Sequence, residues 1–120
     1  NDLNREIALF ILTEAGAKAT CADDGFKALS AFEQADAGTF DLILMDIMMP
    51  NMNGYEATRA IRSLSREDAR TIPIVAMSAN AFTEDKVRCR EAGMDGHLTK
   101  PIDSDKLIDA LAKIMAAKEG

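Results

Sequence analysis

Two unbroken apolar runs constrain this 120-residue sequence more than any other feature. The run 40–46 (FDLILMD) and the second half of 70–79 (RTIPIVAMSA) do not alternate between apolar and polar residues. Strands of this kind are buried on both faces, as in a parallel sheet that is covered by helices. Strands of such a sheet are therefore predicted over 40–46 and over 70–79, the second ending near Ser78.

Amphipathic segments alternate with the strand-like runs along the whole chain. Helices are predicted over 3–14, 23–35, 54–64, 83–93 and 103–117, with shorter strands over 17–22 and 96–101. Apolar side chains recur at helical spacing, and Gly16 and Gly93 stand where two of these helices should end. The order αβαβαβαβα predicts one α/β domain over residues 1–120.

The bulk composition excludes several classes of protein. Apolar residues make up 48% and charged residues 28%, as in soluble globular proteins. No apolar run is long enough to span a membrane, and residues 1–10 do not form a signal peptide, so a cytoplasmic location is the default expectation. The net charge of -6 argues against non-specific binding to nucleic acid or to an anionic membrane. Cys21 and Cys89 are expected to be reduced and partly buried.

A polar side chain stands at the end of each of three predicted strands. These residues are Asp46, Ser78 and Lys100. Ligands of such sheets bind beyond the carboxyl ends of the strands, so an acid, a hydroxyl and an amine are expected to meet at one edge. Each residue taken alone has an ordinary alternative: a turn or N-cap for the acid, a cap for the hydroxyl, a surface position for the amine. Pro101 follows directly and restricts how Lys100 can point.

Several ordered motifs resemble those of a known family. The segments 42–57 (LILMDIMMPNMNGYEA), 73–82 (PIVAMSANAF) and 89–101 (CREAGMDGHLTKP), followed by an amphipathic helix, resemble the response-regulator receiver domain, which is CheY-like. The resemblance covers nearly the whole chain and is to the receivers of hybrid histidine kinases. It implies a flavodoxin-like, doubly wound parallel sheet in the order 2-1-3-4-5, with helices on both faces.

The resemblance also implies roles for the strand-end residues. Asp46 is similar to the aspartate that accepts a phosphoryl group, and Ser78 to the switch hydroxyl that contacts this group. Lys100 is similar to the lysine that contacts a phosphoryl oxygen. Asp46 and the backbone carbonyl of Met48 are implied as ligands of Mg²⁺. These roles agree with the chemistry, because phosphoryl transfer depends on a positioned nucleophile and on neutralising charge.

The remaining motif residues are implied to shape the site or to switch it. Pro50 and Gly54 match the loop that follows the acceptor, and Lys100-Pro101 resembles the family's cis peptide. His97 stands where the family often has a Tyr or Phe switch residue. The histidine departs from that pattern and leaves the details of switching open.

The N-terminal part of the family's pattern is absent from this sequence. A receiver begins with a strand that ends in two acids, and these acids hold Mg²⁺ together with the acceptor. Here the chain starts at a segment that resembles the first helix, so Mg²⁺ binding is expected to be weakened or absent in this N-terminally truncated chain. Asp23 and Asp24 form another acidic pair, which is expected to open the helix 23–35 instead.

Three explanations for the missing central strand are open. An upstream segment is omitted, which we favour; another chain or a swapped element fills the gap; or the flanking strands rearrange.

The function implied by the resemblance is signal transduction in a two-component system. The domain would take a phosphoryl group on Asp46 in a His-Asp phosphorelay and signal by conformational change. Its implied partner is a histidine kinase or a histidine phosphotransfer domain. The domain would not be an enzyme with a turnover substrate, and any kinase activity would lie in another domain. A stand-alone regulator and a fragment of a hybrid kinase are both open, as is a homodimer or a swapped oligomer.

Two other functions compete with this one. A pseudo-receiver would be a protein-interaction module that takes no phosphate, and loss of the acidic pair favours it if that loss is natural. Retention of Asp46, Ser78 and Lys100 argues against it. An enzyme of the haloacid-dehalogenase type usually needs a second acid two residues after the strand-end aspartate, and Met48 occupies that position.

Overall fold

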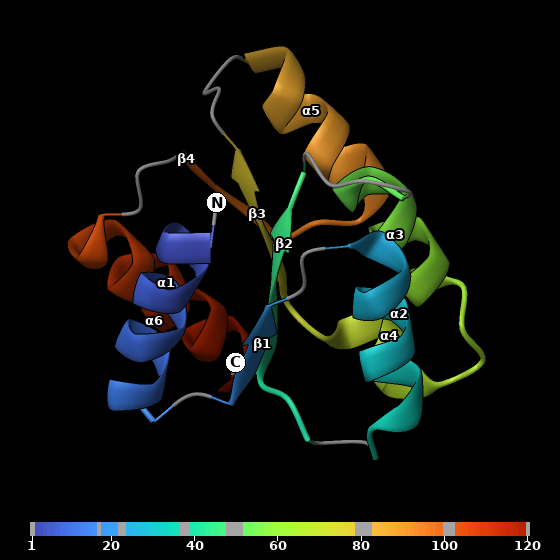
Figure 1. The fold of residues 1–120 in the computed structure, drawn as a ribbon, viewed down its shortest axis with the longest axis horizontal. Coiled ribbons are helices and arrows are strands. Elements are labelled where there is room, and N and C mark those ends of the chain that lie inside the picture. The colour runs from blue at the N-terminus through green and yellow to red at the C-terminus, as the bar shows by residue number, and fades with distance from the viewer. Residues whose placement is uncertain are drawn as a thin grey trace.

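The chain folds into a sheet with helices on both faces (Figure 1). The computed structural model describes residues 2–16, 18–21, 24–36, 39–47, 52–78, 83–99 and 103–119. The elements in chain order are α1 (Asp2–Glu14), β1 (Ala19–Cys21), α2 (Gly25–Gln34), β2 (Leu42–Asp46), α3 (Gly54–Arg62), α4 (Glu67–Thr71), β3 (Ile74–Ser78), α5 (Thr83–Ala92), β4 (Gly96–Thr99) and α6 (Ser104–Glu119).

The four described strands are all parallel and lie in the order β1-β2-β3-β4. Residues at alternate positions of β2 point to opposite faces of the sheet. Ile43 and Met45 pack against the helices α2, α3, α4 and α5, whereas Leu42 and Leu44 pack against α1 and α6. Two separate apolar cores result, and every residue of β2 and β3 is buried. This confirms the predicted fold class.

The strands that flank the expected gap pair directly with each other. Ala19 lies opposite Leu42, and Cys21 lies opposite Leu44, in a parallel ladder (Figure 1). The described strands β1, β2, β3 and β4 thus match strands 2, 3, 4 and 5 of the implied order. No described strand lies between β1 and β2, where strand 1 is implied.

The structure corrects one predicted element. The strand predicted over 70–79 begins only at Ile74, and the short helix α4 precedes it. Acidic residues fill the first turn of α4, as the helix dipole favours, and Pro73 separates helix from strand. The prediction was wrong here because the apolar pattern was extended backward over polar residues.

Side-chain caps fix the starts of two helices. Asp24 caps α2, because its Oδ1 accepts hydrogen bonds from the backbone N–H of Phe26 at 2.7 Å and of Lys27 at 3.4 Å. This confirms that Asp24 opens the second helix; Asp23 lies outside the described residues. Asn53 and Glu56 form a capping box at α3, with each side chain accepting from the other residue's backbone N–H.

Arg62, at the end of α3, ties several segments together at the amino edge of the sheet. Its guanidinium donates to the carbonyl of Gly93 from Nε at 3.1 Å and from Nη2 at 2.9 Å, and to the carbonyl of Ala69 at 3.0 Å. Nη2 also contacts Asp95 Oδ2 at 2.9 Å, and this oxygen accepts the backbone N–H of Ile74 at 2.9 Å. Burial lowers the pKa of Arg62, although Asp95 opposes that shift. The start of β3 is thereby linked to the residue before β4.

Arg66 makes a similar link between α2 and α4. Its Nη1 donates to the carbonyl of Phe32 at 2.9 Å, and its guanidinium lies 4.8 Å from the centre of the Phe32 ring. The same guanidinium forms an ion pair with Asp68 at 2.8 Å. These contacts hold the segment before β3 against the end of α2.

Replacing Arg62 with alanine is expected to lower the free energy of unfolding by about 2 kcal/mol, because buried carbonyls lose charged donors. Urea denaturation at constant pH measures this change. The matched control is Lys113→Ala, which removes an exposed ion pair with Asp109 and should change the same quantity by less than about 0.5 kcal/mol. Equal losses in the two variants would contradict the structural role of Arg62.

Candidate functional site

Asp46 is held at the carboxyl end of β2, in the interior of the sheet. Its side chain is buried, and only 2% of the residue is exposed. The residue lies opposite Met77 of β3, and the next N–H, of Ile47, donates to the carbonyl of Met77 at 3.1 Å. Strand pairing therefore continues through the end of β2 and fixes the position from which the carboxylate projects.

The start of α3 packs directly against this strand end. The N–H of Gly54 donates to the carbonyl of Ile47 at 3.0 Å. A Cβ atom at position 54 would lie 2.6 Å from the carbonyl oxygen of Asp46 and 2.9 Å from the Cα of Ile47. Only glycine allows the helix to approach the backbone of Asp46 this closely.

Gly25 is a second glycine at which two backbone segments lie close together, and sequence reasoning missed it. Its N–H donates to the carbonyl of Met52 at 3.1 Å, and a Cβ atom at position 25 would collide with the same carbonyl and with the Met52 side chain. The start of α2 is thereby held against the segment before α3. A glycine directly after the Asp23-Asp24 pair was the available signal, but a turn explained it equally well.

Ser78 lies at the carboxyl end of β3, on the strand next to Asp46. The residue directly before it, Met77, is the strand partner of Asp46. Ser78 is buried, and its Oγ lies 2.8 Å from Nε2 of His97. His97 belongs to β4, opposite Ala76, so its half-buried ring reaches toward the end of β3. The structure thus brings Asp46, Ser78 and His97 to one edge of the sheet.

Four predicted site residues, Met48, Pro50, Lys100 and Pro101, lie outside the described residues. Within the described ranges, no group of three or more His, Cys, Asp or Glu side chains is arranged to hold a metal ion. The nearby acid Asp24 serves as the N-cap of α2. Asp46 is therefore the predicted metal ligand whose side chain the structure places at this edge.

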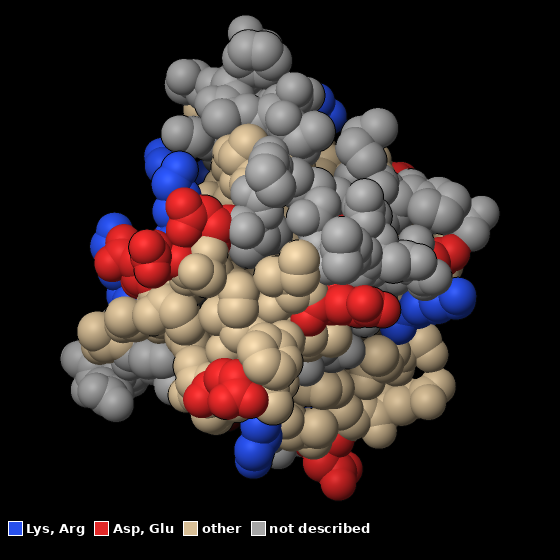
Figure 2. Space-filling view, turned by 60° about the vertical axis from the view of Figure 1, so that its left-hand side comes forward, with Lys and Arg blue, Asp and Glu red and all other residues tan. Residues whose placement is uncertain are grey.

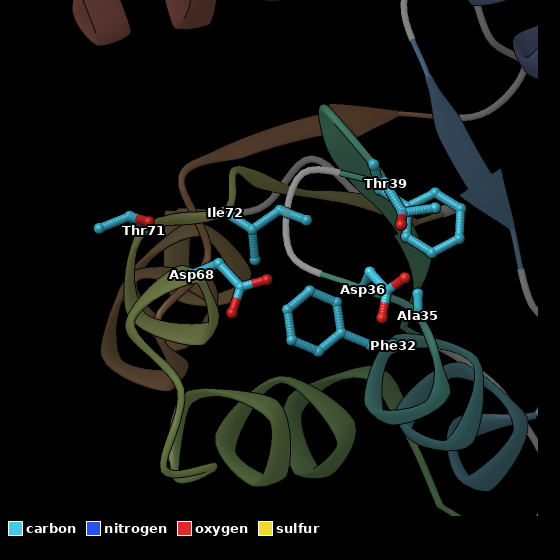
Figure 3. A pocket seen from close by; sticks show the side chains of 8 residues that line it. Phe32, Ala35, Asp36, Thr39, Asp68, Thr71 and Ile72 are labelled. Atoms are coloured by element: carbon cyan, nitrogen blue, oxygen red, sulfur yellow. The ribbon is translucent and has the colours of Figure 1, made fainter.

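A separate small cavity lies at the opposite edge of the sheet (Figure 3). It encloses about 90 Å³, and its lining includes Phe32 of α2 together with Phe40 and Ile72, which precede β2 and β3. The carboxylates of Asp36 and Asp68 lie on either side of the Phe32 ring. Because this cavity is at the amino ends of the strands, it is not part of the site around Asp46.

The fold and the strand-end residues define a flavodoxin-like α/β domain with an acid and a hydroxyl at its carboxyl edge. The chain belongs to the family described as the response regulator receiver domain, whose model matches residues 1–112. None of the helices that the structure describes is long and apolar enough to cross a membrane.

Curated relatives and solved structures agree with this family. The sensor histidine kinase RcsC of Salmonella typhi is 39% identical over 110 residues, which is 92% of this chain and 11% of RcsC. The receiver domain of the sensor histidine kinase PA1611 from Pseudomonas aeruginosa PAO1, with a magnesium ion coordinated in its active site cleft, is 34% identical with a TM-score of 0.79. That match covers 97% of this chain and 91% of the other.

The chemotaxis response regulator CheY4 of Vibrio cholerae is 30% identical with a TM-score of 0.79, over 92% of this chain and 88% of the other. The sensor protein GacS of Pseudomonas syringae pv. syringae is 37% identical over 114 residues, which is 94% of this chain and 12% of GacS. This chain therefore spans only about a tenth of the sensor kinases RcsC and GacS that it matches.

Replacing Gly54 with alanine is expected to destabilise the protein by about 2 kcal/mol or more and to displace Asp46, because the added Cβ meets backbone atoms that cannot move cheaply. The matched control is Gly96→Ala, whose Cβ would meet Val75 side-chain atoms at 3.6 Å, an ordinary contact. Thermal unfolding measures the stability, and the amide shifts of 44–47 report the strand end. A Gly54 variant as stable as the Gly96 variant would contradict this packing.

Proposed function

We propose that this domain accepts a phosphoryl group on Asp46 in a His-Asp phosphorelay. The observation that carries the proposal is the buried Asp46 carboxylate at the end of β2, beside Ser78 on the neighbouring strand. Membership of the receiver family supports it, as does the similarity to sensor histidine kinases. Signalling would follow from a conformational change when the phosphoryl group binds.

The chemical step is a transfer between two side chains. An oxygen of the Asp46 carboxylate attacks the phosphorus of a phosphohistidine, a P–O bond forms, and the P–N bond to the imidazole breaks. The product is an acyl phosphate on Asp46 and a free histidine in the donor. Because a carboxylate is a competent nucleophile toward phosphorus, the main task of the protein is to hold the reactants in line.

Two side chains would then hold the transferred group. The Ser78 hydroxyl would donate a hydrogen bond to one phosphoryl oxygen, which its place beside Asp46 supports. The Lys100 amine would neutralise charge on another, as the family resemblance implies. Met48, Pro50 and Pro101 are assigned by the same resemblance, with Pro50 and Gly54 shaping the loop. Lys is suited to this role because its ammonium is a compact charge.

Mg²⁺ fits the donor chemistry of this edge only in part. The ion prefers oxygen ligands and usually keeps several waters, so the Asp46 carboxylate and the Met48 carbonyl are suitable ligands. Within the described ranges, no group of three or more His, Cys, Asp or Glu side chains is arranged to hold a metal ion, and Asp24 caps α2. When bound, the ion would neutralise charge on the phosphoryl oxygens.

The proposed partner is a histidine kinase or a histidine phosphotransfer domain. In Figure 2, acidic side chains are spread across the visible face among uncharged ones, and Lys and Arg lie mostly toward its margins. This distribution and the net charge of -6 favour a protein partner over nucleic acid. A cytoplasmic location suits such a relay.

Incubation with Mg²⁺ and acetyl phosphate is expected to add the mass of one phosphoryl group, and Asp46→Asn should abolish this gain. Intact-protein mass spectrometry measures it. Asp36→Asn, an exposed acid at the opposite edge, is the matched control and should keep the gain.

The same experiment distinguishes the alternatives. A gain that requires an added upstream strand with two acids would support the truncated-receiver interpretation. No gain with or without that strand would contradict the proposal and favour the pseudo-receiver.

Lys100→Ala is expected to leave the fold largely intact, because the proposed role of the amine is to contact the phosphoryl group. The response of a partner to phosphorylation should be uncoupled. Thermal unfolding and a partner-binding assay with and without acetyl phosphate measure the two effects. A large loss of thermal stability would show instead that Lys100 is mainly structural.

A further inference from the structure

The contact between Ser78 and His97 has a chemical property that the proposed phosphoryl transfer does not use. The Ser78 Oγ lies 2.8 Å from Nε2 of His97, within hydrogen-bonding distance. Ser78 is 6% exposed, and the His97 residue is half-buried. His97 is the only histidine in the sequence. A single titratable ring therefore contacts the hydroxyl that is proposed to bind the phosphoryl group.

The protonation state of the ring decides the direction of this hydrogen bond. In a neutral ring with its proton on Nδ1, Nε2 is an acceptor, and the Ser78 hydroxyl proton is directed to it. A phosphoryl oxygen must then compete with the ring for that proton. In the protonated ring Nε2 is a donor, so Ser78 accepts from the histidine and can donate its own proton to a different acceptor.

We propose that His97 makes phosphoryl binding at this site sensitive to pH by setting the direction in which the Ser78 hydroxyl donates. The inference rests on the proposed function, because it concerns the group that Asp46 would carry. Protonated His97 releases the Ser78 proton for a phosphoryl oxygen and adds a positive charge near a dianion. Both effects favour the phosphoryl-bound state at low pH. The neutral ring retains the proton and weakens binding.

The ring is accessible to protons because surface cavities lie on both sides of β4. The cavity toward α5 measures about 260 Å³, and the one toward α6 about 340 Å³; His97 lines both. The ionisable side chains that line them with it are Cys89, Arg90, Asp95, Lys106, Asp109 and Lys113. Positive and negative groups are thus both present around the ring. None of these lining side chains other than His97 is an imidazole.

The sign of the pH effect follows from linkage. A phosphoryl group that binds the protonated form more tightly must raise the titration midpoint of His97 by the same coupling. Binding is therefore strongest below that midpoint and weakens as the pH rises through it. The expected change is about threefold to tenfold in affinity, the size of one net hydrogen bond.

The first experiment tests the contact without metal or phosphate. Nitrogen NMR of the His97 ring reports its tautomer and its titration midpoint in the full chain, and Ser78→Ala removes the hydroxyl. We expect the neutral ring of the wild type to carry its proton on Nδ1, and the alanine variant to shift the tautomer balance and the midpoint. A neutral ring with its proton on Nε2, or identical titrations in the two proteins, would overturn the inference.

The second experiment measures phosphoryl-group binding directly. Beryllofluoride with Mg²⁺ is titrated into the wild type, His97→Phe and His97→Gln at about pH 5.5 and about pH 7.5, and binding is followed by fluorine NMR. The phenylalanine variant keeps an aromatic ring, and the glutamine variant keeps a polar group that does not titrate. The wild type should bind about threefold to tenfold more tightly at the lower pH, relative to both variants.

The outcomes separate the inference from the function on which it rests. An equal pH dependence in all three proteins would overturn the role of His97 and leave the phosphoacceptor proposal intact. Absence of binding at either pH, with or without an added upstream strand that ends in two acids, would overturn the phosphoacceptor proposal and this inference with it. The quantity compared among the three proteins is the ratio of affinities at the two pH values. The dependence of beryllofluoride chemistry on pH affects every ratio equally and therefore cancels.

Discussion

The arrangement of this domain depends on the burial of β2 on both faces and its pairing along both edges. Its side chains enter two separate cores, and β1 and β3 lie on either side of it. A strand confined in this way cannot slide or rotate without breaking both cores. The residue at its carboxyl end is therefore held with little freedom, although it is a charged residue. The position of Asp46 is a consequence of the apolar run before it.

Much of the fold was predictable from the sequence, because long apolar runs and helical periodicity are strong local signals. The strands β2 and β3, the helices around them and the parallel arrangement follow from residues such as those of 42–46. The predicted start of β3 was wrong because α4 is only about one turn long. The sequence signals for this helix, two acids after Arg66, are weak. Short helices of this kind depend on tertiary contacts, here the Arg66 contacts with Phe32 and Asp68.

The candidate site was predictable only in part. Asp46 and Ser78 were found because strand ends of parallel sheets meet at one edge. The direct pairing of β1 with β2 was not predicted, because a local pattern does not determine which strands become neighbours. The close approach of Gly25 to Met52 and the hydrogen bond between Ser78 and His97 join segments far apart in sequence. Such contacts become apparent only when the register of the strands is known.

The packing of α1 against α6 has a consequence for how this domain can be used in a longer protein. The first and last helices lie side by side on the same face of the sheet (Figure 1). A segment joined to the start of α1 or to the end of α6 would therefore leave the domain from a helix on this face of the sheet. A neighbouring domain joined through either helix would be tethered near this face, and tethering raises the effective concentration of a partner. The way this domain is attached can thus favour its contact with a domain of the same chain over contact with a separate molecule.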